Sequence, residues 1–390
     1  MKRISNSFPR LMAVFTLAAF LFAVVSTTTV QAAQDEEGEI EQTLKQLTER
    51  AANGYFAPIV TPIGTDLNGG WFHKAPPAKV FGLDFEVGVV GMATYWPDDV
   101  VKTFDVTDTT FKFSDDQAWD LVLALGLGDA TVEQALFDQI KGLNFSVSIH
   151  GPNIIGDPDD EIEIDFSGAD VTFIDPNTLL ERTETLGADT WALTGVGGLS
   201  FLEELSFVPL AAPQLGIGTI FGTRATFRIL PTIDISSVPP FSLFLDEEFG
   251  KISYFGFGLQ HNPGVFLPTP LPVDVAVAFY TQTLKIGTDF LKVKTTAFGV
   301  NASKKLGIGP LNITPYAGFM LEKSTIDIAY QYEIEGAGTP QEIDIDLHFD
   351  GENKSRITLG LSLRLLLFNI NADYNIGKYN SYTVGIMFAL

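Results

Sequence analysis

The last nine residues, Tyr382 to Leu390, alternate large apolar side chains with smaller or more polar ones. The large apolar positions are Tyr382, Val384, Ile386, Phe388 and Leu390. Side chains alternate across a β-strand, so the segment has one apolar face that continues to the end of the chain. On a soluble protein such an edge would favour aggregation, whereas the closing strand of a transmembrane β-barrel turns this face to lipid. The pattern therefore predicts an all-β fold, a transmembrane antiparallel β-barrel.

Residues 1–33 are predicted to be a secretory signal peptide. Lys2, Arg3 and Arg10 form a basic region, Leu11 to Val25 is apolar, and Val30 and Ala32 then supply small residues at the −3 and −1 positions of a cleavage site. This order is typical of a cleaved signal, and the apolar stretch is short for a membrane span. An uncleaved anchor is the alternative, but Ser-Thr-Thr-Thr follows Val25 where a stop-transfer charge cluster would stand.

The composition excludes several classes of protein. The chain has 48 acidic and 24 basic residues, a net charge of −24, which repels nucleic acid. It has no cysteine, which excludes disulfides, thiol catalysis and cysteine-ligated zinc. The hydrophobic content of 46% argues against disorder.

Seven further segments alternate like the last one, with apolar residues on one face and polar or small residues on the other. They are 81–89, 215–221, 253–259, 273–279, 313–321, 357–365 and 370–376. Shorter strands are expected near 145–150, 161–173 and 191–202. Two helices are expected between Ser114 and Gly142, and the sequence does not fix on which side of the membrane these helices lie. A barrel of about 12–14 strands is predicted, since single bacterial chains usually close with an even number.

The segment before the first strand is expected to fold as a helix followed by irregular chain. Apolar residues recur at helical spacing over 36–52, and Pro58 and Pro62 then interrupt the pattern. The segment is a plug if it enters the lumen and a periplasmic tail if it does not, and its aromatic content favours the plug. We therefore predict a helix and plug-like segment at 34–78 and a barrel at 79–390.

Catalytic and metal-binding motifs are not found in the sequence. The four histidines lie far apart, and none belongs to a metal-binding or serine-nucleophile motif. The acidic run from Asp157 to Asp165 lacks the spacing of an EF-hand loop, and a solvated strand face explains it. We predict no enzyme, no cofactor and no metal site, with acidic loops as the places where divalent cations would bind.

Six residues are candidates for ligand binding. Arg224 and Arg228 share one strand face and would either attract an anionic headgroup or pair with Asp84 and Glu86 across the lumen. The remaining candidates are aromatic residues ahead of the barrel: Tyr55, Phe56, Trp71 and Phe72. A channel for apolar solutes needs such side chains, whereas the alternative is that they only pack the plug against the barrel.

The order of a signal peptide, a plug-like segment, Gly- and Phe-rich strands and loop helices resembles the long-chain fatty acid transporter family of the outer membrane. The run from Gly258 to Pro263, followed by Leu271 to Ala276, is similar to that family's strand–turn–strand unit. Leu67 to Phe72 resembles uncharacterised barrel proteins of Bacteroidota-like bacteria more closely. The resemblance covers nearly the whole mature chain at the level of architecture. The Asn-Pro-Ala motif of the family's plug has no counterpart here, so no binding residue is transferred.

The predicted function is an outer-membrane channel or transporter for small hydrophobic or amphiphilic molecules in a Gram-negative bacterium. The expected partners are outer-membrane lipid, the solute and divalent cations at the acidic loops, and not nucleic acid. A general diffusion porin, or a structural or adhesive barrel with cation-binding loops, is the alternative.

Overall fold

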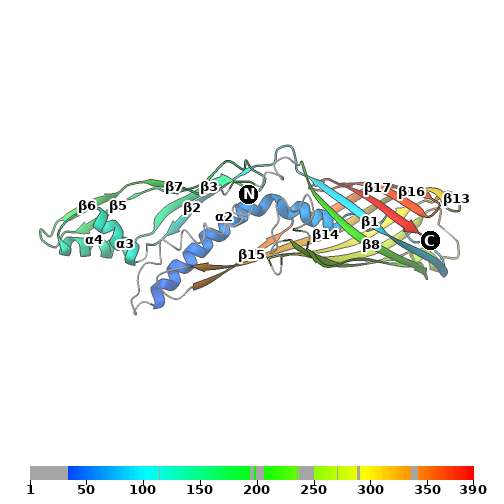
Figure 1. The fold of residues 1–390 in the computed structure, drawn as a ribbon, viewed down its shortest axis with the longest axis horizontal. Helices are drawn as coiled ribbons and strands as arrows, with labels where there is room; N and C mark the ends of the chain where they lie inside the picture. The colour runs from blue at the N-terminus through cyan, green and yellow to red at the C-terminus, as the bar shows by residue number, and fades with distance from the viewer. Residues whose placement is uncertain are drawn as a thin grey trace, which may run out of the picture. The chain divides into compact units, whose positions relative to one another are not determined.

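The computed structural model describes residues 34–113, 115–193, 197–198, 206–234, 236, 250–269, 271–287, 290–334 and 341–390. The predicted signal peptide lies outside these residues. The chain divides into two compact units, which are described separately (Figure 1). The barrel unit comprises Ala57–Val100, Glu204–Ala329 and Asp346–Leu390, and the second unit comprises the remainder.

Ten antiparallel strands close into a barrel, which confirms the predicted fold class. In ring order they are β1 (Phe81–Tyr95), β8 (Phe207–Ile220), β9 (Thr223–Asp234), β10 (Lys251–His261), β11 (Asp274–Ile286), β12 (Leu291–Ser303), β14 (Leu311–Ile334), β16 (Ser355–Leu365), β17 (Phe368–Ile376) and β18 (Ser381–Ala389). The ring is closed because β1 pairs with both β8 and β18, and β12 pairs with β14. Two further strands, β13 (Leu306–Ile308) and β15 (Gln341–Asp350), pair with β14.

Strict alternation explains why these strands form a barrel in lipid. In β18 the residues from Ser381 to Ala389 alternate between buried and exposed positions, and the exposed ones include Tyr382, Val384 and Ile386. The exposed faces of the other barrel strands are likewise largely apolar, while their buried faces are rich in Gly, Ser, Thr, Asn and Gln. An apolar outer belt around a polar interior is the pattern of a transmembrane barrel.

The barrel has ten strands rather than the roughly 12–14 expected from the sequence. The short strands of the chain's first half form two separate small sheets in the second unit instead. One sheet has the order β2 (Thr103–Phe111), β3 (Phe145–Pro152), β4 (Ile162–Phe166) and β7 (Asp189–Leu193), and the other pairs β5 (Ala169–Ile174) with β6 (Glu181–Leu186). Their alternation looks the same in sequence, but the strands β3 to β7 have only five to eight residues and are shorter than the ~9–11 needed to cross a bilayer.

The second unit also contains the two predicted helices, α3 (Asp115–Ala124) and α4 (Ala130–Gly142). Asp129 caps α4 by accepting hydrogen bonds from the backbone of Thr131 and Val132. Trp119 and Phe137 stack between the helices with ring centroids 4.5 Å apart. These aromatic residues therefore pack the helices together.

The helix α2 (Gln34–Asn68) is longer than predicted and continues through Pro58 and Pro62. The expectation of irregular chain from residue 53 onward was wrong over this part. Pro62 has no N–H to donate to the carbonyl four residues earlier, which belongs to Pro58. Trp96 Nε1 donates to that carbonyl at 2.9 Å, so the barrel compensates for the missing helical bond. None of the described helices combines the length and apolar content required to span a membrane.

Candidate functional site: the filled lumen

Residues 57–78, here called the plug segment, run through the lumen from one rim of the barrel to the other. At one rim, Glu352 N donates to Thr61 at 3.1 Å, and Thr94 donates to Asp66 at 2.5 Å a short way inside. Thr94 lies near the end of β1, so the opposite rim, called the C-terminal rim, is where β1 begins and β18 ends.

The plug segment reaches the C-terminal rim through backbone contacts. Ala75 N donates to Ser303 Oγ at 2.9 Å, and Asn262 Nδ2 donates to the Pro76 carbonyl at 2.7 Å. Ala78 N then donates to Asp274 at 3.3 Å, just before β1 begins. The segment therefore passes along the whole lumen, which confirms the predicted plug.

Two arginines of the barrel wall hold the end of α2. Arg228 donates to the carbonyls of Leu67 and Gly69 at 3.1 and 2.7 Å, and Arg356 donates to the Asn68 carbonyl at 2.5 Å. The final carbonyls of a helix have no helical partner and bear partial negative charge. The last turn of α2 has no basic residue of its own, so the barrel supplies the cations.

An aromatic cluster follows in the middle of the lumen. Trp71 stacks on Tyr280 with centroids 5.2 Å apart, and Phe72 contacts both Tyr280 and Tyr316 at 6.3 and 6.0 Å. The Arg228 guanidinium lies 4.2 Å from the Trp71 ring centroid, a cation–π contact. All of these side chains are buried.

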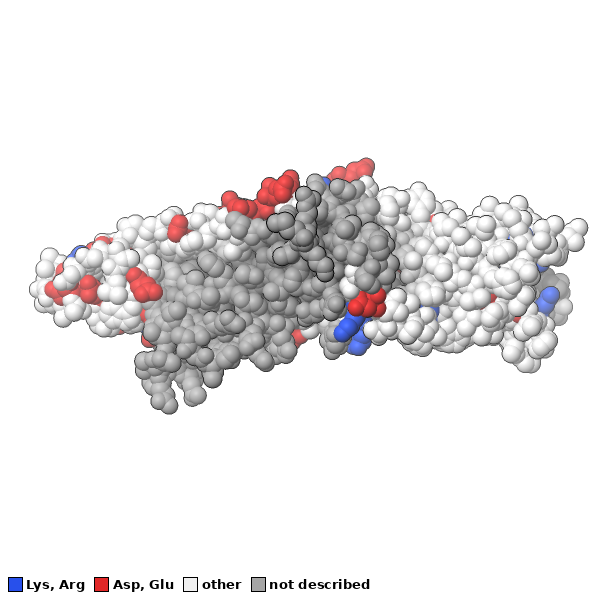
Figure 2. All heavy atoms as spheres, in the orientation of Figure 1, with Lys and Arg blue, Asp and Glu red and all other residues white. Residues whose placement is uncertain are grey.

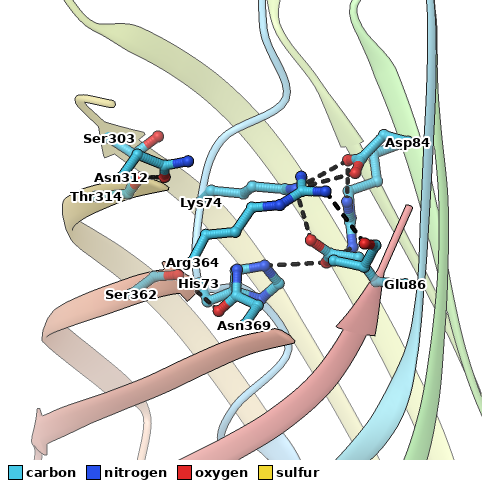
Figure 3. A network of polar contacts seen from close by, with 12 residues as sticks. His73, Lys74, Asp84, Glu86, Ser303, Asn312, Thr314, Ser362, Arg364 and Asn369 are labelled. Atoms are coloured by element: carbon cyan, nitrogen blue, oxygen red, sulfur yellow. Dashed lines mark hydrogen bonds and ion pairs between the residues drawn. The ribbon is translucent and has the colours of Figure 1, made fainter. Parts of the chain in front are cut away.

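The plug segment is fixed near the C-terminal rim by a charged cluster (Figure 3). Glu86 Oε2 lies 3.0 Å from His73 Nε2 and 2.5 Å from Arg224 Nη2, and Glu86 Oε1 lies 2.8 Å from Lys74 Nζ. Asp84 also pairs with Lys74, at 3.0 Å, and with Arg224. Glu86 is only 1% exposed, so three groups able to be cationic surround one buried carboxylate.

The wall formed by β14, β16, β17 and β18 is largely hydrophilic on its inner face, apart from Tyr316 and Met320 of β14, which belong to the aromatic cluster. Its buried side chains include Asn312, Thr314, Thr358, Ser362, Asn369, Asn371, Asp373, Asn375, Ser381 and Thr383, some of which appear beside the charged cluster in Figure 3. Many bond one another, as Ser362 does with Asn369 at 2.8 Å and Tyr316 with Asp373 at 2.8 Å. Asn371 Nδ2 and Ser381 Oγ have no hydrogen-bond partner among the described residues. The lumen thus has an aromatic side and an amide- and hydroxyl-rich side.

The structure brings four of the six predicted ligand-binding residues into the lumen. Trp71, Phe72 and Arg228 belong to or touch the aromatic cluster, while Arg224 pairs with Asp84 and Glu86, one of the two alternatives foreseen. Arg228 pairs with backbone carbonyls instead.

The other two predicted ligand-binding residues belong to the second unit. Tyr55 and Phe56 are buried there, and the Tyr55 hydroxyl donates to the Gly197 carbonyl at 3.3 Å. The structure therefore does not place them with the lumen residues. A role in ligand binding stays a prediction for all six.

His73, Lys74 and Tyr280 contribute to the lumen but were not predicted as site residues. The alternation of β11 places Tyr280 on the inner face of the barrel. The sequence does not indicate that Tyr280 stacks on Trp71. His73 and Lys74 directly follow the two aromatic residues and precede the inward carboxylates of β1. That juxtaposition of cationic groups and carboxylates is the one signal from which the cluster could have been inferred.

The acidic run from Asp157 to Asp165 belongs to the second unit, where it leads into the strand β4 (Ile162–Phe166). There His150 Nε2 lies 2.9 Å from Glu163 Oε2, and His150 Nδ1 lies 3.3 Å from Asp165 Oδ2. Among the described residues no group of three or more histidine, aspartate or glutamate side chains is arranged to hold a metal ion. Cation binding at the acidic loops stays a prediction.

The closed ring, the apolar belt and the filled lumen define a transmembrane β-barrel of the outer-membrane type with its own internal plug. The chain belongs to a family of unknown function, DUF6588, whose model matches residues 9–390. No curated protein matches it.

Several solved outer-membrane structures are similar to the chain. A loop L8 deletion mutant of OmpT from Vibrio cholerae is 12% identical, with 80% of this chain and 100% of that chain covered and a TM-score of 0.22. A bacterial polysaccharide outer-membrane secretin is 10% identical, with 80% and 100% covered and a TM-score of 0.22. The outer-membrane channel DcaP of Acinetobacter baumannii is 9% identical, with 79% and 98% covered and a TM-score of 0.16. With such low TM-scores these structures add no argument, and the barrel is defined by its own strand pairing.

Proposed function

We propose that this protein is an outer-membrane channel for small hydrophobic or amphiphilic molecules, gated by the plug segment. The observation that most supports this proposal is that the plug segment fills the lumen between an aromatic side and a hydrophilic side. When it moves, both sides become available to one solute. A molecule with an apolar body and polar groups matches this pair of surfaces, so amphiphilic solutes are the favoured class.

Two features of the lumen support an amphiphilic solute. Tyr280 and Tyr316 would exchange Trp71 and Phe72 for the apolar part of the solute. Asn371 on the hydrophilic side has an amide donor without a partner among the described residues, and a buried donor of that kind costs about 1–3 kcal/mol. A polar group of the solute would satisfy it.

A general diffusion porin is less well supported. Such a porin needs an unobstructed aqueous lumen. Here the plug segment buries Trp71 and Phe72 in the middle and closes the C-terminal rim with the charged cluster. Solutes can pass only after these contacts are lost.

The connections between the strands support an orientation with the C-terminal rim in the periplasm. At this rim β8 and β9 are joined by Phe221 and Gly222 alone, and β16 and β17 by Leu366 and Leu367. At the opposite rim, residues 96–206 lie between β1 and β8. Outer-membrane barrels have short periplasmic turns and long external loops.

A structural or adhesive barrel is the second candidate. The observation that favours it is the second unit, in which residues 101–203 form sheets and helices of their own. Its surface includes exposed carboxylates such as Glu163 and Glu181. A barrel with only this role would need no movable plug.

Solute flux into proteoliposomes tests the proposal. We expect a permanently charged sterol amphiphile, used below its micellar concentration, to enter faster than maltose. The expected ratio is roughly tenfold, which burial of about 55 Å² of the apolar surface of the sterol, worth about 1.4 kcal/mol, provides. Equal rates for both solutes would identify a general porin. No flux of either solute would leave the structural barrel as the better account.

A further inference from the structure

Arg228 of β9 is a buried cation that contacts no carboxylate among the described residues. It is 0% exposed, and the visible face of the barrel is largely uncharged in the space-filling view (Figure 2). From the barrel wall Arg228 receives only the amide oxygens of Gln214 and Gln282, at 2.9 and 3.4 Å, and the Met92 sulfur at 3.7 Å. A buried charge without a counter-charge is costly. The wall by itself therefore leaves Arg228 unbalanced.

The carboxylates of the lumen have other partners. These partners are Arg224 and Lys74 for Asp84 and Glu86, Arg356 for Glu322, Thr94 for Asp66, Ala78 and Asn262 for Asp274, and Tyr316 and Asn375 for Asp373. The charge of Asp373 acts on Arg228 from a distance, but no contact joins these two described side chains. Arg228 thus differs from Arg224 and Arg356, each of which has an ion pair.

The plug segment supplies the missing balance. Arg228 Nη1 and Nη2 donate to the carbonyls of Leu67 and Gly69 at 3.1 and 2.7 Å, and the guanidinium lies 4.2 Å from the Trp71 ring centroid. The carbonyls at a helix C-terminus bear partial negative charge, and so does the face of an aromatic ring. All three partners belong to the plug segment, so Arg228 loses them when that segment leaves the lumen.

The Trp71 ring lies in a flat space of the barrel wall. A methyl group added at Gly256 or Gly258 would come within 2.7 or 3.2 Å of this ring, so the ring lies close to the backbone of β10. Tyr280 stacks on the ring with centroids 5.2 Å apart and planes at 20°. The space bounded by Gly256, Gly258, Tyr280 and Arg228 is here called the ring slot. Its shape suits a planar ring better than a flexible chain.

An oxygen lies at the edge of the ring in this slot, and it is bound to Arg228. Trp71 Nε1 donates to the Leu67 carbonyl at 2.9 Å, and the same carbonyl accepts from Arg228 Nη1. The Gly69 carbonyl places a second oxygen on Nη2. A guanidinium binds the two oxygens of one carboxylate or sulfonate in the same two-pronged way. The plug segment therefore imitates a planar ring with an anionic substituent.

We propose that the ring slot is the solute site and that it selects planar aromatic or fused-ring molecules with an anionic carboxylate or sulfonate group. The ring replaces Trp71 on Tyr280, and the anion replaces the two carbonyls on Arg228. This inference rests on the proposed channel function, because the solute reaches the slot when the plug segment leaves it. It goes further by giving the sign of the charge and the shape of the apolar part.

Equilibrium binding to the full chain with Trp71→Ala, in neutral detergent, tests the proposal, because this substitution empties the ring slot. The probes are naphthalenesulfonate, the planar cation naphthyltrimethylammonium and the flexible anion hexanesulfonate. We expect naphthalenesulfonate to bind roughly tenfold more tightly than the planar cation, as for a hydrogen bond to a charged group. It should bind roughly fivefold more tightly than hexanesulfonate, because only a ring stacks on Tyr280. The wild type, whose slot is filled, should bind it more weakly than the variant.

A matched pair of second substitutions assigns the anion to Arg228. Arg228 and Arg356 both donate to carbonyls at the end of α2, but Arg356 pairs with Glu322 and does not border the ring slot. In the Trp71→Ala background, Arg228→Gln should abolish the tenfold preference for the anion, whereas Arg356→Gln should keep it. Folding is checked by heat-modifiable gel mobility, and Trp71→Leu replaces the alanine variant if that variant does not fold.

The outcomes separate this inference from the proposed function. Equal binding of the three probes would overturn the ring slot as the solute site, even if solutes cross wild-type proteoliposomes. Equal losses in the two double variants would also overturn it. Selective binding of naphthalenesulfonate without flux of any solute would support the ring slot and contradict the channel instead.

Discussion

Replacing Glu86 by glutamine is expected to open the channel. Its contacts with His73 and Lys74 exist only while the plug segment is in the lumen. Breaking a buried ion pair by removing one partner costs about 3–5 kcal/mol, which corresponds to a shift of roughly a hundredfold or more in the ratio of closed to open barrels. The measurement is conductance in planar bilayers, with the open fraction compared between wild type and variant.

The control for this variant is Glu352→Gln at the opposite rim. Glu352 pairs with Lys378 at 2.6 Å, but both side chains are more than half exposed. Exposed ion pairs contribute about 0–1 kcal/mol, so conductance should remain that of the wild type. If Glu86→Gln conducts no more than this control, the charged cluster does not hold the plug closed.

Replacing Trp71 by alanine is the second change with a large expected effect. The indole is buried, stacks on Tyr280 and donates from Nε1 to the Leu67 carbonyl at 2.9 Å. Loss of a buried tryptophan lowers stability by about 3–5 kcal/mol, and in this protein the loss destabilises the state in which the plug segment fills the lumen. We expect higher conductance and a lower Tm in circular dichroism.

A second substitution separates packing of Trp71 from a general loss of stability. A methyl group added at Gly256 would come within 2.7 Å of the Trp71 ring. Gly256→Ala should therefore destabilise the wild type by about 1–3 kcal/mol but cost much less in Trp71→Ala, where the ring is absent. Equal costs in both backgrounds would contradict the packing of Trp71 against β10.

The barrel could be predicted from the sequence because its signal is local. Alternation in segments such as 357–365 and 382–390 directly reports a strand with one face in lipid. The number of strands could not be predicted, because Ile162, Ile164 and Phe166 alternate as a barrel strand would. In β4 they form the buried face of a small sheet, and the sequence pattern does not distinguish lipid from protein.

The lumen was predictable only in part, because its contacts join distant parts of the chain. Pairing of Arg224 with Asp84 and Glu86 was one of two alternatives foreseen, since all three are inward polar residues of a barrel. The hydrogen bonds from Arg228 to the carbonyls at the end of α2 were not predicted. Pro58 and Pro62 indicated that the helix had already ended, and the compensating bond from Trp96 depends on the tertiary fold.

The central claim is that the plug segment must leave the lumen for solutes to pass. The chain has no cysteine, so a single engineered disulfide can test it cleanly. Ala75 of the plug segment and Ser303 of β12 are suited to this, because Ala75 N and Ser303 Oγ are 2.9 Å apart.

The most direct measurement is flux of the sterol amphiphile through the double variant Ala75→Cys and Ser303→Cys, before and after reduction. We expect no flux while the disulfide is intact and wild-type flux after reduction, with both single-cysteine variants insensitive to the reductant. Undiminished flux through the oxidised double variant would contradict gating by the plug segment.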